Sequence, residues 1–173
     1  MLFGKASAHP HGLVEEHKLH EDDIVLIDGG CSVEGYASDV TRTTVFGTPT
    51  EKMKNVWNIV RKAQDAALKT AKPNIPAESV DAAARKIISD ANFGPDYKYF
   101  THRLGHGIGM EGHEWYYLVR GNKRPLQAGN MFSNEPGIYI VGEFGIRLED
   151  EMLITENGAK LLLPQAESLE KIF

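Results

Sequence analysis

The order in which hydrophobic patterns follow one another constrains the fold of this chain most. Short apolar or alternating runs occur near both ends, whereas two longer stretches between them repeat apolar residues at helical spacing. Strands, then helices, then strands predict an α+β fold with a mainly antiparallel sheet. At 173 residues, 42% of them hydrophobic, and without a linker or repeat, the sequence predicts a single domain over residues 1–173.

The predicted strands fall into two groups. "DDIVLIDGG" (residues 22–30) is a short apolar run bounded by charges and glycines, and "YASDVTRTTVFG" (36–47) is rich in β-branched residues, so together they predict a hairpin. Residues 130–163 predict two or three further strands. Their turn signals are Gly142, Gly145 and Asn157-Gly158, the last being a strong hairpin signal.

Two helices are predicted between the strand groups. The first runs from an N-cap at Thr50 to Ala71, and the second covers residues 77–92. The next stretch, "FTHRLGHGIGMEGHE" (100–114), is rich in glycine and histidine. Each interior glycine costs a helix about 1 kcal/mol, so this stretch is predicted to be irregular or to contain strand ends. Taken alone, it fits a structural loop as well as a functional one.

The composition excludes several classes of partner. The net charge of −5 leaves no basic stripe, so nucleic acid is not an expected partner. No apolar run approaches the roughly 18–20 residues that span a bilayer, and no signal peptide is evident, so the protein is expected to be cytoplasmic, without a membrane partner. The single cysteine, Cys31, is expected to be a small buried hydrophobic residue.

Two aspartates lie on the strands of the first predicted hairpin. If its turn is centred between Val33 and Glu34, Asp28 and Asp39 stand directly opposite each other, with Cβ atoms about 4.5–5.5 Å apart. Like charges at that distance repel, and a metal ion would remove the repulsion. The alternative is one aspartate beside a turn and one on the surface, and a register slip of one residue would put the two on opposite faces.

Two glutamates repeat this arrangement in the last third of the chain. Glu135 and Glu149 flank a hairpin centred close to Gly142, which requires an odd-numbered turn containing glycine. Pro136 biases the backbone of Glu135 toward the extended region. The alternative for Glu149, which has charged neighbours in "IRLEDE", is an exposed strand edge.

Four carboxylates and one imidazole from the glycine-rich loop form an oxygen-rich donor set with one nitrogen. Such a set suits two divalent first-row ions. Paired ions can hold a bridging hydroxide near neutral pH and polarise a carbonyl, which is hydrolytic chemistry. The absence of a set of cysteines argues against a structural zinc site.

Six motifs occur in the order found in one known family: "AHPHG", "DDIVLIDGG", "GYASDVTRT", "HRLGHGIGMEGHE", "NEPGIYI" and "GIRLEDEMLIT". Over nearly its whole length the sequence resembles the pita-bread metallopeptidases, which include methionine aminopeptidase, prolidase, Xaa-Pro aminopeptidase and creatinase. The motifs are most similar to the proline-peptide branch. The resemblance implies a pita-bread fold with a curved sheet and outer helices. It also implies a metal-dependent exopeptidase that hydrolyses Xaa-Pro bonds of peptides or dipeptides through a hydroxide bound by two metal ions.

The resemblance assigns roles to particular residues. The implied metal ligands are Asp28, Asp39, His106, Glu135 and Glu149. Asp39 and Glu149 would bridge the ions, and Glu135 would also accept the proton of the attacking water. The implied ions are Mn²⁺ or Co²⁺, with Zn²⁺ or Fe²⁺ as alternatives.

Other residues are implied in substrate binding. His113 would help to stabilise the tetrahedral intermediate, and His11 would line the pocket. The implied pocket or supporting residues are His102 and Arg147. Trp115 is expected at the substrate end of the pocket. The implied partners are a proline-containing peptide and a second copy of the chain in a dimer.

The sequence departs from the family pattern in two places. Two helices and a strand usually precede "PHG", so the domain is expected to be incomplete at its N-terminal side. Trp115 and Tyr116 stand where relatives often have prolines, which leaves specificity open. The histidines that match no functional position, and are expected on the surface, are His9, His17 and His20.

Two alternatives from other classes stay open. A truncated pita-bread module that binds peptide or protein without catalysis is favoured by the missing segment and disfavoured by the complete ligand set. Metal-free, creatinase-like hydrolysis of a small amidine is disfavoured by the same complete set of carboxylates.

Overall fold

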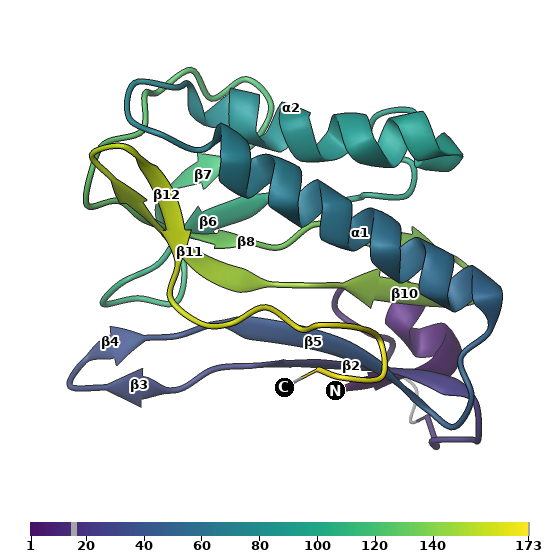
Figure 1. The fold of residues 1–173 in the computed structure, drawn as a ribbon. Coiled ribbons are helices and arrows are strands. Elements are labelled where there is room, and N and C mark those ends of the chain that lie inside the picture. Colours follow the sequence, from purple (N-terminus) through teal and green to yellow (C-terminus); the bar gives the residue numbers. More distant parts are fainter. Residues whose placement is uncertain (15–16, 173) are drawn as a thin grey trace.

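The computed structural model describes residues 1–14 and 17–172, which form antiparallel strands with two helices packed on one side (Figure 1). Helix α1 covers Glu51–Thr70 and α2 covers Ala77–Ile88; a 3-10 turn spans Gly4–Ala8 and a π-helical turn Ser89–Phe93. The strands are β1 (Leu2–Phe3), β2 (Asp23–Gly29), β3 (Ser32–Val33), β4 (Tyr36–Ala37), β5 (Val40–Phe46), β6 (Gly105–Gly107), β7 (Glu114–Leu118), β8 (Met131–Asn134), β9 (Gly137–Ile140), β10 (Phe144–Arg147), β11 (Asp150–Thr155) and β12 (Gly158–Leu161). All strand pairings between these elements are antiparallel, which confirms the predicted α+β class.

The first sheet has the strand order β1-β2-β5, and its hairpin confirms the two strands predicted there. The predicted register was wrong, because Asp28 pairs with Thr41 rather than facing Asp39. The turn lies at Glu34-Gly35, where both residues have positive φ, as a tight hairpin turn requires. Because the register differs by an even number of positions, Asp28 and Asp39 still share a face, as diagonal neighbours.

The C-terminal region contains five strands, where two or three were predicted. β9 and β10 form the predicted hairpin around Gly142, which has a φ of 87°. Gly145, predicted as a turn, instead lies inside β10, where a Cβ atom would stand 2.0 Å from the Ser7 carbonyl oxygen. Close backbone packing therefore explains this glycine. β11 and β12 form the hairpin predicted at Asn157-Gly158 and belong to a sheet of order β12-β11-β8-β6-β7.

Both helices occur where they were predicted, but α2 ends at Ile88, and the π-helical turn Ser89–Phe93 stands where its last predicted turn was expected. The Thr50 hydroxyl caps α1 by accepting a hydrogen bond from the Met53 amide (3.2 Å). Fully buried apolar side chains line the inner face of each helix, including Val56 and Val60 on α1 and Val80 on α2. The helices pack on each other and on the C-terminal strands, and so build the core on one side of the sheet.

An isolated bridge joins the two strand groups. Thr41 of β5 pairs with Glu149, whose amide donates to the Thr41 carbonyl (3.1 Å). The next residue, Asp150, contacts Gln64 of helix α1. Because successive side chains of a strand point to opposite faces, Glu149 points away from the helices. The face without helices therefore receives the predicted site.

Two expectations about surfaces can be compared with the structure. No helix among residues 1–14 and 17–172 is long and apolar enough to cross a bilayer. Cys31 was expected to be buried, and this was wrong: the thiol is exposed, with its Sγ 3.4 Å from Ser38 Oγ. It precedes the projecting β3–β4 hairpin (Figure 1), where exposed neighbours provide no core to enter.

Candidate metal centre

A cleft of about 470 Å³ brings together residues from both strand groups and from the glycine-rich loop. The predicted site residues that line it are His11, Asp28, Asp39, His102, His106, His113, Glu135, Arg147 and Glu149. Trp115 does not line it; this side chain is 68% exposed and lies beside a separate depression. The cleft therefore gathers every predicted metal ligand.

Three of the four carboxylates form one cluster. Asp28, Asp39 and Glu149 each place an oxygen within 4.8 Å of the others. Thr41 Oγ1 donates a hydrogen bond to Glu149 Oε2 (2.6 Å), and the Asp39 amide donates to Glu151 Oε1 (2.8 Å). These contacts with protein groups hold Asp39 and Glu149 in place without a bound ion.

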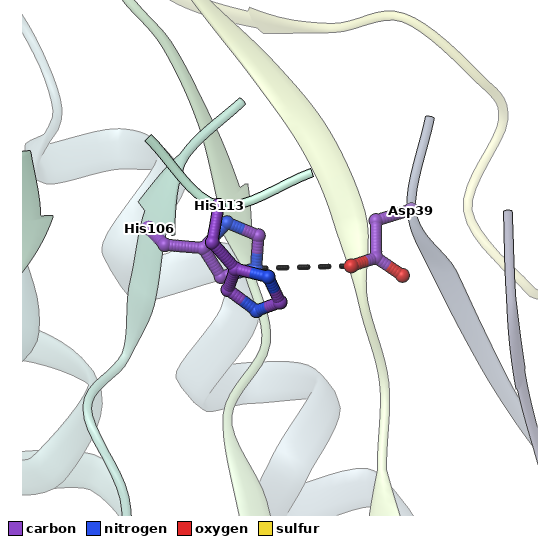
Figure 2. A group of neighbouring side chains, drawn as sticks. All are labelled: Asp39, His106 and His113. Atoms are coloured by element: carbon purple, nitrogen blue, oxygen red, sulfur yellow. Dashed lines mark ion pairs between the residues drawn. The ribbon is translucent and has the colours of Figure 1, made fainter. Parts of the chain in front are cut away.

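His106 faces these acids from strand β6. Figure 2 shows its ring next to His113, with Asp39 pointing toward the pair. His106 Nδ1 lies 3.0 Å from the Gly107 carbonyl oxygen, which can only accept, so Nδ1 carries the hydrogen. Nε2 is then free of hydrogen and lies 3.5 Å from Glu135 Oε1 and 3.7 Å from Asp39 Oδ2. This is the tautomer that a metal-binding imidazole requires.

Burial favours the neutral forms of the acids and of His106, so it raises the pKa values of the acids and lowers that of the histidine. It raises the pKa of Asp39 to about 6, with a further contribution from the charge of Asp28. It raises the pKa of Glu135 to about 7, against the opposing effect of Arg147. Burial, followed by the charges of Glu135 and Asp39, raises the pKa of Glu149 well above its ordinary value.

The donor set fits a pair of divalent cations. Burial also lowers the pKa of His106 to about 4, so its ring is neutral at pH 7. Carboxylates held this close disfavour one another's charge, and a cation between them relieves that penalty. Two groups of potential ligands share Glu149, namely Asp28–Asp39–Glu149 and His106–Glu135–Glu149, which provides a donor set for each of two ions.

The raised pKa values predict how stability depends on pH in the metal-free chain. Asp39 and Glu135 have folded-state pKa values of about 6 and about 7, above their ordinary values of 3.8 and 4.5. Their favourable contribution is complete below the ordinary values and is lost as pH rises through the folded ones. The lowered pKa values of His102 and His106 act in the opposite direction, because their neutral rings favour the folded state more as pH rises toward 6.5. The contribution of the two acids alone should therefore fall by a few kcal/mol, at about 1.4 kcal/mol per pKa unit.

Urea unfolding of chelator-treated protein from pH 4 to pH 8 measures this effect. Glu135→Gln is the matched variant, because an amide does not titrate and the histidine contributions are common to both proteins. The stability of the wild type relative to this variant should fall as pH rises. A stability of the wild type relative to Glu135→Gln that stays flat or rises over this range would contradict the raised pKa of Glu135.

Buried residues that the sequence did not single out support the site. Ser133 Oγ donates to Glu135 Oε1 (3.2 Å) and accepts from the His106 amide (3.1 Å). The Tyr139 hydroxyl accepts from Arg147 Nη1 (3.1 Å) and lies 2.8 Å from His102 Nε2. Strand alternation is the signal that would have found them, since Ser133 and Tyr139 lie an even number of positions from Glu135.

The Arg147 side chain connects the two halves of the cleft. Its Nη2 pairs with Asp28, its Nε donates to Thr41 Oγ1 (3.2 Å), and its Nη1 reaches the Pro10 carbonyl (3.2 Å). Burial lowers the pKa of His102 to about 3, so this ring is also neutral. Both residues line the cleft, and their supporting roles stay predictions.

The other histidines lie at the mouth of the cleft or outside it. His113 and His11 are exposed. His113 stacks on His106 with a ring separation of 4.0 Å, and its nitrogen could join Asp39 and His106 around an ion. His17 and His20 are exposed and His9 is half-buried, outside the cleft lining.

Comparison with known proteins places this site in a family. The profile of metallopeptidase family M24 matches residues 1–156. An Xaa-Pro dipeptidase from Lactobacillus delbrueckii subsp. lactis is 47% identical over 157 residues, which are 91% of this chain and 42% of that protein. Dipeptidase PepE from Mycobacterium ulcerans superimposes with a TM-score of 0.91 and 43% identity, over 97% of this chain and 45% of that one.

A prolidase from Pyrococcus furiosus gives a TM-score of 0.88 with 43% identity, over 93% of this chain and 47% of that one. The fold is the pita-bread fold of these neighbours, and this chain spans less than half the length of the relatives it matches. The predicted family resemblance is confirmed over most of the sequence. The chain belongs to metallopeptidase family M24.

Proposed function

We propose that this chain is a metal-dependent exopeptidase that hydrolyses Xaa-Pro bonds in dipeptides or short peptides. The observation that carries the proposal is the convergence of four carboxylates and His106 in one cleft. Matched relatives whose names give Xaa-Pro dipeptidase or prolidase support the substrate class. Because the chain spans less than half of those proteins, the activity of this chain itself is part of what we propose.

The proposal assigns five residues to two divalent ions, Mn²⁺ or Co²⁺ first and Zn²⁺ or Fe²⁺ as alternatives. The ligands would be Asp28, Asp39, His106, Glu135 and Glu149, with Asp39 and Glu149 shared between the ions. Oxygen donors with one imidazole nitrogen suit these ions. When bound, the ions supply Lewis-acid activation of a water molecule and of the scissile carbonyl.

The chain's own groups would move the proton and stabilise charge. Glu135 is the proposed acceptor of the proton from the attacking water, since its carboxylate lines the cleft beside His106, with Oε1 3.5 Å from His106 Nε2. Ser133 orients this carboxylate through its 3.2 Å hydrogen bond. His113, exposed at the mouth beside His106, is the proposed donor to the developing oxyanion, and His11 lines the same opening.

Cleavage of an alanyl-proline dipeptide, with alanyl-alanine as the matched control, tests this function. With Mn²⁺ present we expect turnover of alanyl-proline at least about tenfold above that of alanyl-alanine, and none after chelation. Two bound ions without turnover of either dipeptide would contradict the peptidase and favour a peptide-binding module.

The proposal treats residues 1–173 as one catalytic unit, with a proline-containing peptide as its partner. The sequence also led us to expect a homodimer and a cytoplasmic location, and both stay predictions. Equal turnover per chain over a wide range of protein concentration would show that any dimer is unnecessary for activity.

A further inference from the structure

A buried polar network lies behind the candidate metal centre, on the helix side of the strands. Arg42 of β5 and Asp150 of β11 are 5% and 1% exposed, and Gln64 of α1 is fully buried. Arg42 Nη2 donates to Asp150 Oδ1 (2.7 Å), and Gln64 Nε2 donates to Asp150 Oδ2 (2.9 Å). Both oxygens of the Asp150 carboxylate therefore accept a hydrogen bond, one from β5 and the other from α1.

The network also holds the backbone at two of the proposed ligands. Arg42 Nη1 donates to the Glu149 carbonyl oxygen (2.8 Å). Gln64 Nε2 donates to the carbonyl oxygen of Asn134, the residue before Glu135 (3.2 Å). Asp150 directly follows Glu149 in sequence. Alternation along the strands then places the ligands on one face and this network on the other.

The position of the network matches the junction between the two carboxylate pairs. Asp28 and Asp39 belong to the first hairpin, whereas Glu135 and Glu149 flank the β9–β10 hairpin, and the two hairpins lie in different sheets. They meet at the bridge between Thr41 and Glu149. In Figure 1, β11 runs between β5 and helix α1, so Asp150 reaches both.

We propose that Arg42, Asp150 and Gln64 are positioning residues that set the separation of the two carboxylate pairs, and thereby the affinity for the metal pair. This inference rests on the proposed function. A buried ion pair adds little stability over an apolar pair of the same volume, but a buried carboxylate with both oxygens bonded is held in one geometry. Metal ligands have to be held within about 0.5 Å of the binding geometry, and a fixed contact between the two strand groups would provide that precision.

The test is calorimetric titration of Mn²⁺ into chelator-treated protein at 25 °C, with the melting temperature measured alongside. In Asp150→Asn, the amide NH₂ faces a donor of Arg42 or Gln64, and two donors cannot bond to each other. One hydrogen bond of the network is therefore lost, and the contact between the two strand groups becomes less fixed. Residues that support metal ligands typically contribute about 10–100-fold in affinity, and we expect Asp150→Asn to raise the Mn²⁺ Kd by that factor. Val80→Ala on α2 is the control, because it removes fully buried apolar volume from a helix that carries none of the three network residues.

The outcomes are distinguishable. A tenfold or larger rise in Kd for Asp150→Asn, with Val80→Ala within about threefold of wild type, supports the positioning role. Equal Kd values for Asp150→Asn and wild type, or an equal loss in Val80→Ala, overturn it while leaving the proposed function intact. A wild-type chain that binds no Mn²⁺ overturns the proposed function and this inference together.

A second variant keeps the test valid if Asp150→Asn does not fold. Arg42→Lys retains the positive charge but cannot reach both Asp150 and the Glu149 carbonyl with a planar fork. We expect it to raise the Mn²⁺ Kd by about tenfold, and a wild-type Kd in this variant would also overturn the positioning role.

Discussion

Glu135→Gln is expected to lower kcat for an Xaa-Pro dipeptide by about 10²–10⁴-fold at saturating Mn²⁺. The variant keeps the shape of the side chain and its acceptor for Ser133, but an amide cannot take a proton from water. The native carboxylate lies in the cleft, with its Oε1 3.5 Å from His106 Nε2. Steady-state hydrolysis of alanyl-proline measures the effect.

The control for this variant is Glu143→Gln. Glu143 pairs with Lys52 on the surface, with nearly half of its side chain exposed, so the same chemical change there should leave kcat unaltered. A turnover of Glu135→Gln equal to wild type, at equal metal content, would remove this residue from the proton-transfer step.

His113→Ala is expected to lower kcat by about 10²–10³-fold while metal content is retained. The two roles open to this ring differ in that respect. As an oxyanion donor it acts on the substrate alone, whereas as a ligand it would share an ion with Asp39 and His106, to which its nitrogen lies close. Parallel measurement of turnover and of Mn²⁺ per chain separates them. Loss of an ion together with turnover would contradict the donor role and make His113 a ligand.

Local patterns in the sequence were sufficient to predict the helices and most strands. Thr50 ends the extended segment and caps α1 as its hydroxyl and position predict. Gly145 misled the prediction because its sequence signal for a turn is the same as its signal for close backbone packing. Only the tertiary structure shows that the Ser7 carbonyl occupies the space of a side chain there.

In the first hairpin, the sequence predicted the shared face of the two aspartates correctly but the strand pairing wrongly. The turn at Glu34-Gly35 shifts the pairing, so Asp28 meets Thr41. The shared face survives, because a displacement of two positions preserves the direction of every side chain. The prediction that Asp28 and Asp39 lie close therefore held for a reason different from the one assumed.

The burial of Glu149 and of the Arg42–Asp150 pair was beyond sequence reasoning. Glu149 could have been an exposed strand edge, and it is 2% exposed because β5 lies against it. Arg42 and Asp150 form a pair across more than a hundred residues of chain, and nothing local distinguishes them from surface charges. Long-range strand packing decides which charged residues are buried, and sequence periodicity does not report it.

The central claim is that five side chains from distant parts of the chain hold two cations. Elemental analysis of the protein after equilibration with Mn²⁺ and removal of free ion, with an Asp39→Asn, Glu149→Gln double variant as the matched blank, tests it most directly. The account predicts close to two ions per wild-type chain and fewer than one in the double variant. An ion-free wild-type chain, or equal metal content in both proteins, would contradict it.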